Sequence, residues 1–286
     1  MSIEDLSRKL DMSWHTIKQI DKDHLCNKYK HLHIKGVRQI AIDEFAIQKG
    51  HKYMTVVMDL ETRRVIYIGE GRSSDALDSF WKKIQKFKNQ IVGVAMDMWP
   101  AYIKAVSEHL PKAKIIYDWF HVVKTTNQII DELRRQIIRE EKDLAVRKVL
   151  KGKRWVLLKT KSNLKPSEES KLREALKLNE PLMKIYYLKE ELYQVWKCKS
   201  KGQAEEYLDE WFKKARDTGV TKIIKLANMI GSHRTGILNW FDHHISTGPL
   251  EGLNNKIKVL KRRAYGYRDK EYFKLKIYDI HESRYA

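Results

Sequence analysis

Short apolar runs rich in β-branched residues alternate with polar turns between residues 38 and 69. This pattern predicts three strands joined as an antiparallel meander, at residues 38–47, 53–59 and 64–69. A helical repeat of apolar positions follows over residues 74–88, with Ser74 as its cap. A fourth strand at 91–96, parallel to the first, a helix from Pro100 to about residue 109 and a fifth strand at 113–117 complete the predicted series.

Three antiparallel strands, a helix, a strand, a helix and a strand form the element order of the ribonuclease-H-like fold. We therefore predict an α/β protein with a mixed sheet, whose core is built from residues 37–124 and 246–286. Between them, residues 125–245 are charged and have helical spacing, which predicts a large helical insertion. Only residues 155–158 could form a strand there. The tryptophans of this region are interpreted as core anchors and not as base-stacking platforms: Trp155, Trp196, Trp211 and Trp240.

The first 36 residues contain two short amphipathic segments, with Ser13 as a plausible cap for the second. If Leu6, Leu10, Ile17 and Ile20 face inward, the segments form part of a helix-turn-helix. They could equally be a helical leader packed on the main domain. Both interpretations stay open.

Three acidic residues stand where an acid is locally out of place. Asp43 interrupts the apolar run 40–47, Asp97 ends the run 91–97, and Glu251 opens a basic helix. Adjacent parallel strands lie about 4.8 Å apart, so Asp43 and Asp97 at matching height would repel each other unless they shared a cation. Mg²⁺ prefers such oxygen ligands, and two ions about 3.5–4 Å apart can drive an in-line phosphoryl displacement. The three acids therefore predict a divalent-metal site.

The helix that Glu251 opens has a polar and an apolar side. Pro249 suits the first helical position with Gly248 as the cap, so Glu251 falls in the first turn, where the helix dipole favours its charge. The polar side carries Asn254, Asn255, Lys258 and Arg262, and the buried side carries Leu253, Ile257 and Leu260. An ordinary helix whose glutamate merely favours its N-terminal turn is the alternative.

Composition adds the class of partner. The 286 residues carry 57 Lys and Arg against 37 Asp and Glu, a formal net charge of +20, which predicts attraction to a polyanion such as double-stranded DNA. The density of basic residues after position 255 makes Lys256, Lys258, Lys261, Arg262 and Arg263 the predicted phosphate contacts, unless this is only a solvated helix face. Two cysteines without a paired spacing exclude a disulfide scaffold and suit a reducing cytoplasm, and neither a membrane span nor a signal peptide is predicted.

Five blocks of the sequence resemble the signature of bacterial DDE transposases of the ISL-three type. They are residues 42–47 (IDEFAI), 94–102 (VAMDMWPAY), 117–124 (YDWFHVVK), 248–258 (GPLEGLNNKIK) and 261–267 (KRRAYGY). The resemblance implies that Asp43, Asp97 and Glu251 are the catalytic and metal-binding triad, with two Mg²⁺ ions that Mn²⁺ can replace. It also implies that the protein cleaves the DNA of an insertion sequence and transfers its strands, as a homo-oligomer assembled on that DNA. The expected location is the bacterial cytoplasm, in association with the nucleoid.

Members of that family usually carry a cysteine-rich zinc-binding segment and a complete helix-turn-helix before the catalytic domain. Here only the last part of such a region is visible, so a truncated, non-transposing DNA-binding protein is the alternative. A structure-selective nuclease is a third hypothesis.

For four other polar residues the sequence favours other roles. Glu44 suits a salt bridge, Asp59 suits a turn cap, and Asp118 and His121 suit either positioning near the site or a helix cap and a buried histidine.

Overall fold

The computed structural model describes residues 2–31, 34–48, 50 and 52–281. The chain forms two compact units. The first is discontinuous and combines residues 1–116 with 245–286, and the second comprises residues 117–244. Each is described by itself.

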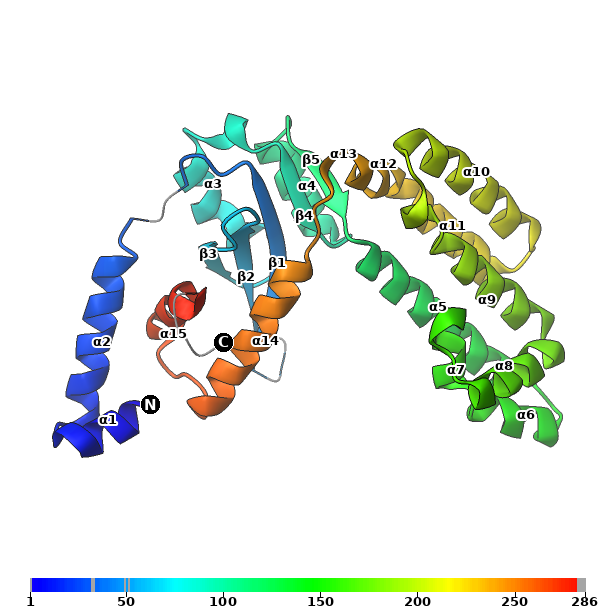
Figure 1. Cartoon of the computed structure of the whole chain (residues 1–286), viewed down its shortest axis with the longest axis horizontal. Helices are drawn as coiled ribbons and strands as arrows, with labels where there is room; N and C mark the ends of the chain where they lie inside the picture. The colour runs from blue at the N-terminus through cyan, green and yellow to red at the C-terminus, as the bar shows by residue number, and fades with distance from the viewer. Residues whose placement is uncertain (1, 32–33, 49, 51, 282–286) are drawn as a thin grey trace. The chain divides into compact units, whose positions relative to one another are not determined.

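A five-stranded mixed sheet forms the centre of the first unit, as predicted (Figure 1). The strand order is β3-β2-β1-β4-β5, where β1 is antiparallel to β2, β2 is antiparallel to β3, and β1 is parallel to β4. The bounds are β1 Gln39–Gln48, β2 Lys52–Asp59, β3 Val65–Glu70, β4 Gly93–Met96 and β5 Lys114–Tyr117. Ile40, Ile42 and Val94 are fully buried, so the near-continuous apolar runs reflect strands covered on both faces.

The helices between the strands begin largely where the sequence predicts. α4 (Pro100–His109) starts with its proline in the first turn, where the missing N–H costs nothing. The single helix predicted over residues 74–88 is wrong, because the segment is divided into η1 (Ser74–Leu77), α3 (Asp78–Ile84) and η2 (Lys88–Gln90). The turn η1 packs so tightly on β3 that a Cβ on Gly69 would lie 1.9 Å from the Ala76 carbonyl oxygen.

Two helices close the first unit at the carboxyl end of the chain. α14 (Gly248–Arg263) packs against β1, and α15 (Lys270–Tyr278), followed by η5 (Asp279–His281), packs against β3 (orange and red in Figure 1). Leu253 and Ile257 are buried as predicted. The cap of α14 is Thr247 and not Gly248, so Pro249 is the second helical residue.

The amino-terminal helices belong to the same unit. α1 (Ile3–Leu10) and α2 (Trp14–Lys28) are joined by a turn, and Ser13 caps α2 by accepting a hydrogen bond from Thr16 N. The predicted inward orientation is wrong for Leu10 and Ile20, which are 55% and 57% exposed.

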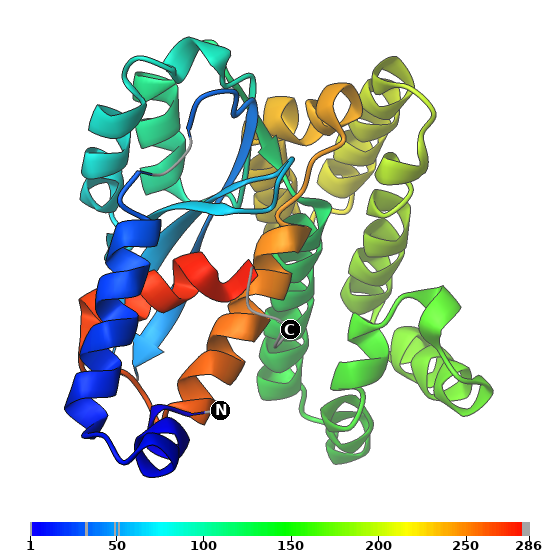
Figure 2. The same cartoon turned by 60° about the vertical axis from the view of Figure 1, so that its left-hand side comes forward.

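The helix α2 instead packs against α15, which crosses it in Figure 2. Lys18 and Lys22 each form an ion pair with Asp269, at 2.9 and 3.1 Å, and the Tyr272 hydroxyl donates to Asp21. These contacts are those that a helical leader packed on the main domain would make.

Apart from Tyr117, the last residue of β5, the regular elements of the second unit are all helices. Its elements are α5 (Trp119–Glu140), α6 (Leu144–Lys151), α7 (Arg154–Leu158), η3 (Lys161–Asn163), α8 (Pro166–Leu178), α9 (Glu180–Leu192), η4 (Val195–Lys197), α10 (Lys201–Asp217), α11 (Thr221–Ser232), α12 (Arg234–Leu238) and α13 (Trp240–His243). The possible strand at 155–158 is therefore wrong, since it lies in α7. Short apolar runs fit either element by periodicity alone.

The tryptophans of this unit differ in their surroundings. Trp211 is 1% exposed and donates from Nε1 to the Leu188 carbonyl at 2.8 Å, which confirms it as a core anchor. The same prediction is wrong for Trp155, which is 68% exposed, with the Arg154 guanidinium carbon 4.8 Å from its ring centroid.

A buried cation ties α7 to α9. Lys189 is 1% exposed and donates from Nζ to the carbonyl oxygens of Leu157 and Lys159, at 3.0 and 2.6 Å. Burial lowers the pKa of this amine to about 8.

Across the described residues, no helix is long and apolar enough to cross a membrane.

Candidate active site

The pairing of β1 with β4 sets the positions of the two aspartates. Gln39 lies opposite Gly93, Ile40 opposite Val94 and Ala41 opposite Ala95. The offset is 93 − 39 = 54 positions, and if it continues two positions beyond the paired residues it sets Asp97, which follows the end of β4, level with Asp43. Because neighbouring strands are about 4.8 Å apart, two carboxylates at equal height on them face a common space.

Asp43 is a partly buried carboxylate held by two hydrogen bonds. Its Oδ1 accepts from the Glu44 backbone N–H at 2.8 Å, and its Oδ2 accepts from the Asn254 side-chain amide at 2.9 Å. Burial, together with the nearby charges of Glu44 and Asp97, raises the pKa of Asp43 from 3.8 to about 7. The charged form of Asp43 is therefore energetically unfavourable in the absence of a metal, and a bound cation would stabilise it.

Asp97 starts the turn that leads into α4. Its Oδ1 accepts from the Trp99 backbone N–H at 3.1 Å, and the Trp99 indole donates to the Arg72 carbonyl at the same distance. One turn into α4, the hydroxyl of Tyr102 lies 2.8 Å from Thr55 Oγ1.

Tyr102 also reports on the acids around it. Burial raises the pKa of this phenol, and the neighbouring charges of Glu44, Asp43 and Asp97 raise it further. The pKa values of Asp43 and Tyr102 are thus raised by charges of the same cluster of carboxylates, which lies near the carboxyl end of β4.

The third predicted acid is placed differently. Helix α14 brings Asn254 to Asp43, whereas Glu251 lies on the exposed surface three residues earlier, about one helical turn away. Among the described residues, no three His, Cys, Asp or Glu side chains are grouped so as to hold one metal ion. The structure thus associates Asp43 with Asp97 and Asn254, and does not group Glu251 with the two aspartates.

The role of Asn254 was missed from the sequence. The sequence predicted its place on the polar side of the helix but not its hydrogen bond to Asp43. The signal that could have found its role is its spacing, since residues three apart on a helix lie side by side and a residue that follows Glu251 by three shares its face.

The residues present fit a hard divalent cation. The donors at this place are carboxylate oxygens, the chemistry that Mg²⁺ and Mn²⁺ accept. The Oδ1 atom of Asn254 is buried without a hydrogen-bond partner, and in the described part of the chain no Lys or Arg forms an ion pair with Asp43. A partly buried anionic carboxylate beside an unsatisfied buried amide oxygen is costly without a cation.

Comparison with known proteins decides the family. The family model described as "Transposase", of the ISL-three type (ISL3), matches residues 40–277, which include all three predicted acids. This chain belongs to that family of DDE transposases.

Named relatives agree with this assignment. The chain is 37% identical over 279 residues to the transposase for insertion sequence element IS1001 of Bordetella parapertussis, covering 96% of this chain and 69% of the relative. It is 30% identical over 256 residues to the transposase for IS1557 of Mycobacterium tuberculosis, covering 82% of this chain. The chain spans 57% of that second transposase.

The basic residues predicted to contact DNA lie on α14 of this family member. Lys258, Arg262 and Arg263 are exposed, whereas Lys256 and Lys261 are partly buried. Lys261 donates from Nζ to the Ala46 carbonyl at 3.0 Å, and burial lowers its pKa. All five cations lie on α14 within about two turns, and Lys261 also joins this helix to β1.

The remaining polar residues have local partners. Asp59 accepts from the backbone N–H groups of Glu61 and Thr62, so its predicted role as a turn cap is confirmed. Asp118 caps α5 by accepting from Phe120 N at 3.0 Å, as the helix-cap alternative predicts. The role of His121 stays a prediction.

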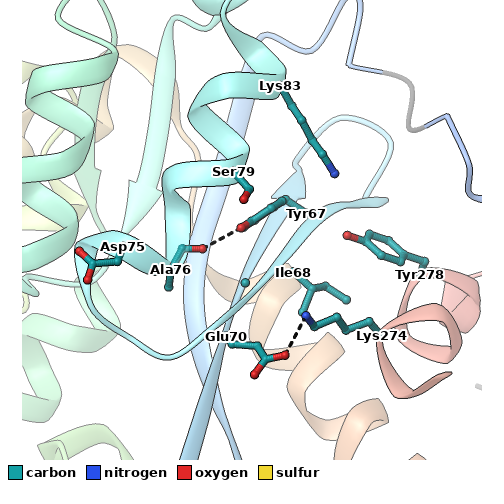
Figure 3. A pocket seen from close by; sticks show the side chains of 10 residues that line it. Tyr67, Ile68, Glu70, Asp75, Ala76, Ser79, Lys83, Lys274 and Tyr278 are labelled. Atoms are coloured by element: carbon teal, nitrogen blue, oxygen red, sulfur yellow. Dashed lines mark hydrogen bonds and ion pairs between the residues drawn. The ribbon is translucent and has the colours of Figure 1, made fainter. Parts of the chain in front are cut away.

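A separate hollow lies between β3, η1, α3 and α15, and Figure 3 shows it from close by. The Tyr67 hydroxyl donates to the Ala76 carbonyl at 2.9 Å, and Lys274 is paired with Glu70 at 3.2 Å. None of the three predicted catalytic acids lines it. Its polar groups are largely satisfied by one another, so it offers no competing centre for the chemistry.

Proposed function

We propose that this family member catalyses divalent-metal-dependent phosphodiester cleavage and strand transfer of the DNA of an insertion sequence. The single observation that carries the proposal is the parallel pairing of β1 with β4, whose offset, continued two positions beyond the paired residues, sets Asp97 level with Asp43. The raised pKa of Asp43, near 7, supports a site built for a cation. Membership of the transposase family supplies the class of reaction.

The proposed architecture is ribonuclease-H-like. The strand order β3-β2-β1-β4-β5, with β4 parallel to β1, supports it. In this proposal residues 37–124 and 246–286 form the catalytic core, residues 125–245 are the insertion before the glutamate, and residues 1–36 are a helical leader. The discontinuous first unit of the structure supports the joining of the two core segments.

Asp43, Asp97 and Glu251 are the proposed metal ligands. When bound, a pair of Mg²⁺ ions, or Mn²⁺ in their place, supplies activation of the attacking oxygen and stabilisation of the leaving oxygen in an in-line displacement. The Asn254 amide keeps Asp43 in one orientation, and the Glu44 N–H holds its other oxygen. Glu251 lies one turn from Asn254 and has three rotatable side-chain bonds with which to approach the aspartates.

Double-stranded DNA, both element ends and target, is the proposed partner, bound by a homo-oligomer in the nucleoid-associated cytoplasm. Lys256, Lys258, Lys261, Arg262 and Arg263 are the proposed phosphate contacts. The +20 charge supports a polyanionic partner, and affinity is expected to fall steeply with salt.

The test uses end-labelled duplexes taken from the DNA on either side of the chain's own gene, incubated with the full chain and Mg²⁺, Mn²⁺ or EDTA. We expect nicking at an element end and joining to a target plasmid with either metal, and neither with EDTA. Asp97→Asn should abolish both, while Asp59→Asn, a buried acid on β2 that caps a turn, should retain them. Undiminished cleavage by Asp97→Asn would remove the role assigned to that residue.

The alternative function, DNA binding without transposition, is separated in the same experiment. Salt-sensitive retention of the duplex with no metal-dependent cleavage by the wild type would favour it. Cleavage without any joined product would instead favour a nuclease.

A further inference from the structure

The connection between α14 and α15 holds an aromatic residue in an unfavourable backbone conformation. Helix α14 ends at Arg263, and Tyr265 follows with φ of 51°, next to Gly266 with φ of 99°. Their N–H groups donate to the carbonyls of Arg262 and Lys261, at 3.1 and 2.9 Å, which closes the helix end. A left-handed residue after a helix is usually glycine or asparagine, because a Cβ is crowded there. Here a tyrosine occupies the first of the two left-handed positions.

The ring of Tyr265 receives no packing in return. The residue is 101% exposed, and in the part of the chain that the structure describes its ring and hydroxyl make no contact with another side chain. The other aromatics nearby behave differently. Tyr267 stacks on Phe273 with ring centroids 4.7 Å apart, and Tyr272 is 4% exposed. Folding therefore strains Tyr265 and also leaves its apolar face in water, a combination that occurs where a residue serves binding.

The surroundings of the ring are cationic. Arg262 and Arg268 are exposed on either side of it in the sequence, next to Arg263. The carboxylate that follows, Asp269, is already paired with Lys18 and Lys22, and among the described residues no ion pair is formed by Arg262 or Arg268. An exposed aromatic ring that lies between these two cations in the sequence suits a nucleic-acid strand, because bases stack on the ring while phosphates meet the charges.

The geometry points to Tyr265 as a nucleobase-stacking residue, and we propose that it binds a base that is unpaired or has left the duplex stack. Arg262 and Arg268 hold the phosphates on either side of that base. The inference deepens the proposed function, since it takes DNA as the partner, but it does not depend on cleavage. With a residue that stacks on an opened base near α14, the protein would bind DNA with locally separated strands more tightly than it binds a closed duplex.

The test compares three forms of the full chain in EDTA, where no cleavage can occur. The probes are a duplex with a central run of unpaired thymidines, carrying one 2-aminopurine, and the same duplex fully paired. Tyr265→Phe keeps the ring. Tyr265→Asn removes it and places at this position a residue that tolerates the left-handed backbone. Binding is measured by anisotropy and stacking by quenching of 2-aminopurine.

We expect Tyr265→Asn to weaken binding of the unpaired probe about 5- to 150-fold, the range for one stacked base, and to abolish the quenching. Binding of the paired duplex should change less than about twofold. Tyr265→Phe should match the wild type. Tm should be unchanged or higher in Tyr265→Asn, whereas a tyrosine with a structural role would give a lower Tm.

Arg262→Gln is the matched control for charge. Arg262→Gln should weaken binding of both probes equally and reduce the salt dependence of binding. The preference for the unpaired probe over the paired duplex should stay as in the wild type. Equal binding of the unpaired probe by Tyr265→Asn and the wild type would overturn the inference, as would a loss in Tyr265→Phe as large as in Tyr265→Asn. Failure of the proposed function would appear separately, as cleavage that survives Asp97→Asn.

Discussion

Replacing Asp43 by asparagine should stabilise the metal-free protein at neutral pH. The side chain keeps its size and an oxygen that can accept one of the two present hydrogen bonds, but it loses the charge that burial penalises. The folded protein holds the Asp43 proton more tightly than the unfolded chain does. Ionisation of Asp43 therefore disfavours folding, and the free energy of unfolding falls as the pH rises from about 4 to about 7.

The magnitude follows from the pKa. A rise from 3.8 to about 7 corresponds to about 4 kcal/mol, at 1.36 kcal/mol for each tenfold change in proton affinity. Wild type and Asp43→Asn should thus differ little in pH dependence below pH 4 and diverge by about 4 kcal/mol by pH 7. The divergence should then remain constant to higher pH.

Urea unfolding in EDTA at a series of pH values, followed by tryptophan fluorescence and circular dichroism, measures this difference. Addition of Mg²⁺ should stabilise the wild type, by about 2.7 kcal/mol at one hundred times its dissociation constant, and leave Asp43→Asn unchanged. Unfolding curves that stay parallel between pH 4 and 7 would refute the reasoning, because they would mean that Asp43 is solvated or already neutralised in the folded state.

Three further changes test the packing and the other charges. Burial tends to raise the pKa of Asp269, but hydrogen bonds from Tyr272 N, Lys18 and Lys22 lower it overall. Asp269→Asn should therefore destabilise the protein at neutral pH, and the difference from the wild type should disappear in acid, where Asp269 is protonated. Unfolding measured over a series of acidic pH values tests this. Gly69→Ala should lower Tm by several degrees or prevent folding because its Cβ would meet a backbone oxygen at 1.9 Å, whereas Gly252→Ala, with open space around it, should raise Tm slightly. The wild type should gain about 3 kcal/mol of stability in urea unfolding as the pH rises from about 8 to 10.5, because the buried Lys189 amine loses its proton before that of the unfolded chain does. Lys189→Met should not show this gain. An identical alkaline profile for both proteins would contradict the assigned burial of the amine.

The sheet could be predicted because its strands carry their own signal. Apolar β-branched runs broken by short turns predict the meander, and the spacing of two such runs predicts that Asp43 and Asp97 share a height. The helix at 100–109 was equally visible, because Pro100 marks its start.

Features that depend on distant partners could not be predicted in this way. The periodicity of α2 does not reveal that its lysines pair with Asp269, about 250 positions away. The exposure of Trp155 depends on which side of α7 meets α8, and a five-residue helix leaves that open. The contact of Asn254 with Asp43 depends on how far α14 slides along β1, which no local pattern records.

The discontinuity of the first unit has a consequence for biosynthesis. The ribosome delivers Asp43 and Asp97 early, then makes all of the second unit, and only afterwards the helix that carries Glu251 and Asn254. A nascent polypeptide therefore holds two of its acids in an unfinished sheet until residues 248–278 have been made, because only then can α14 pack against β1 and α15 against α2. Premature termination anywhere before residue 248 would release a product that lacks α14, and with it the hydrogen bond from Asn254 to Asp43.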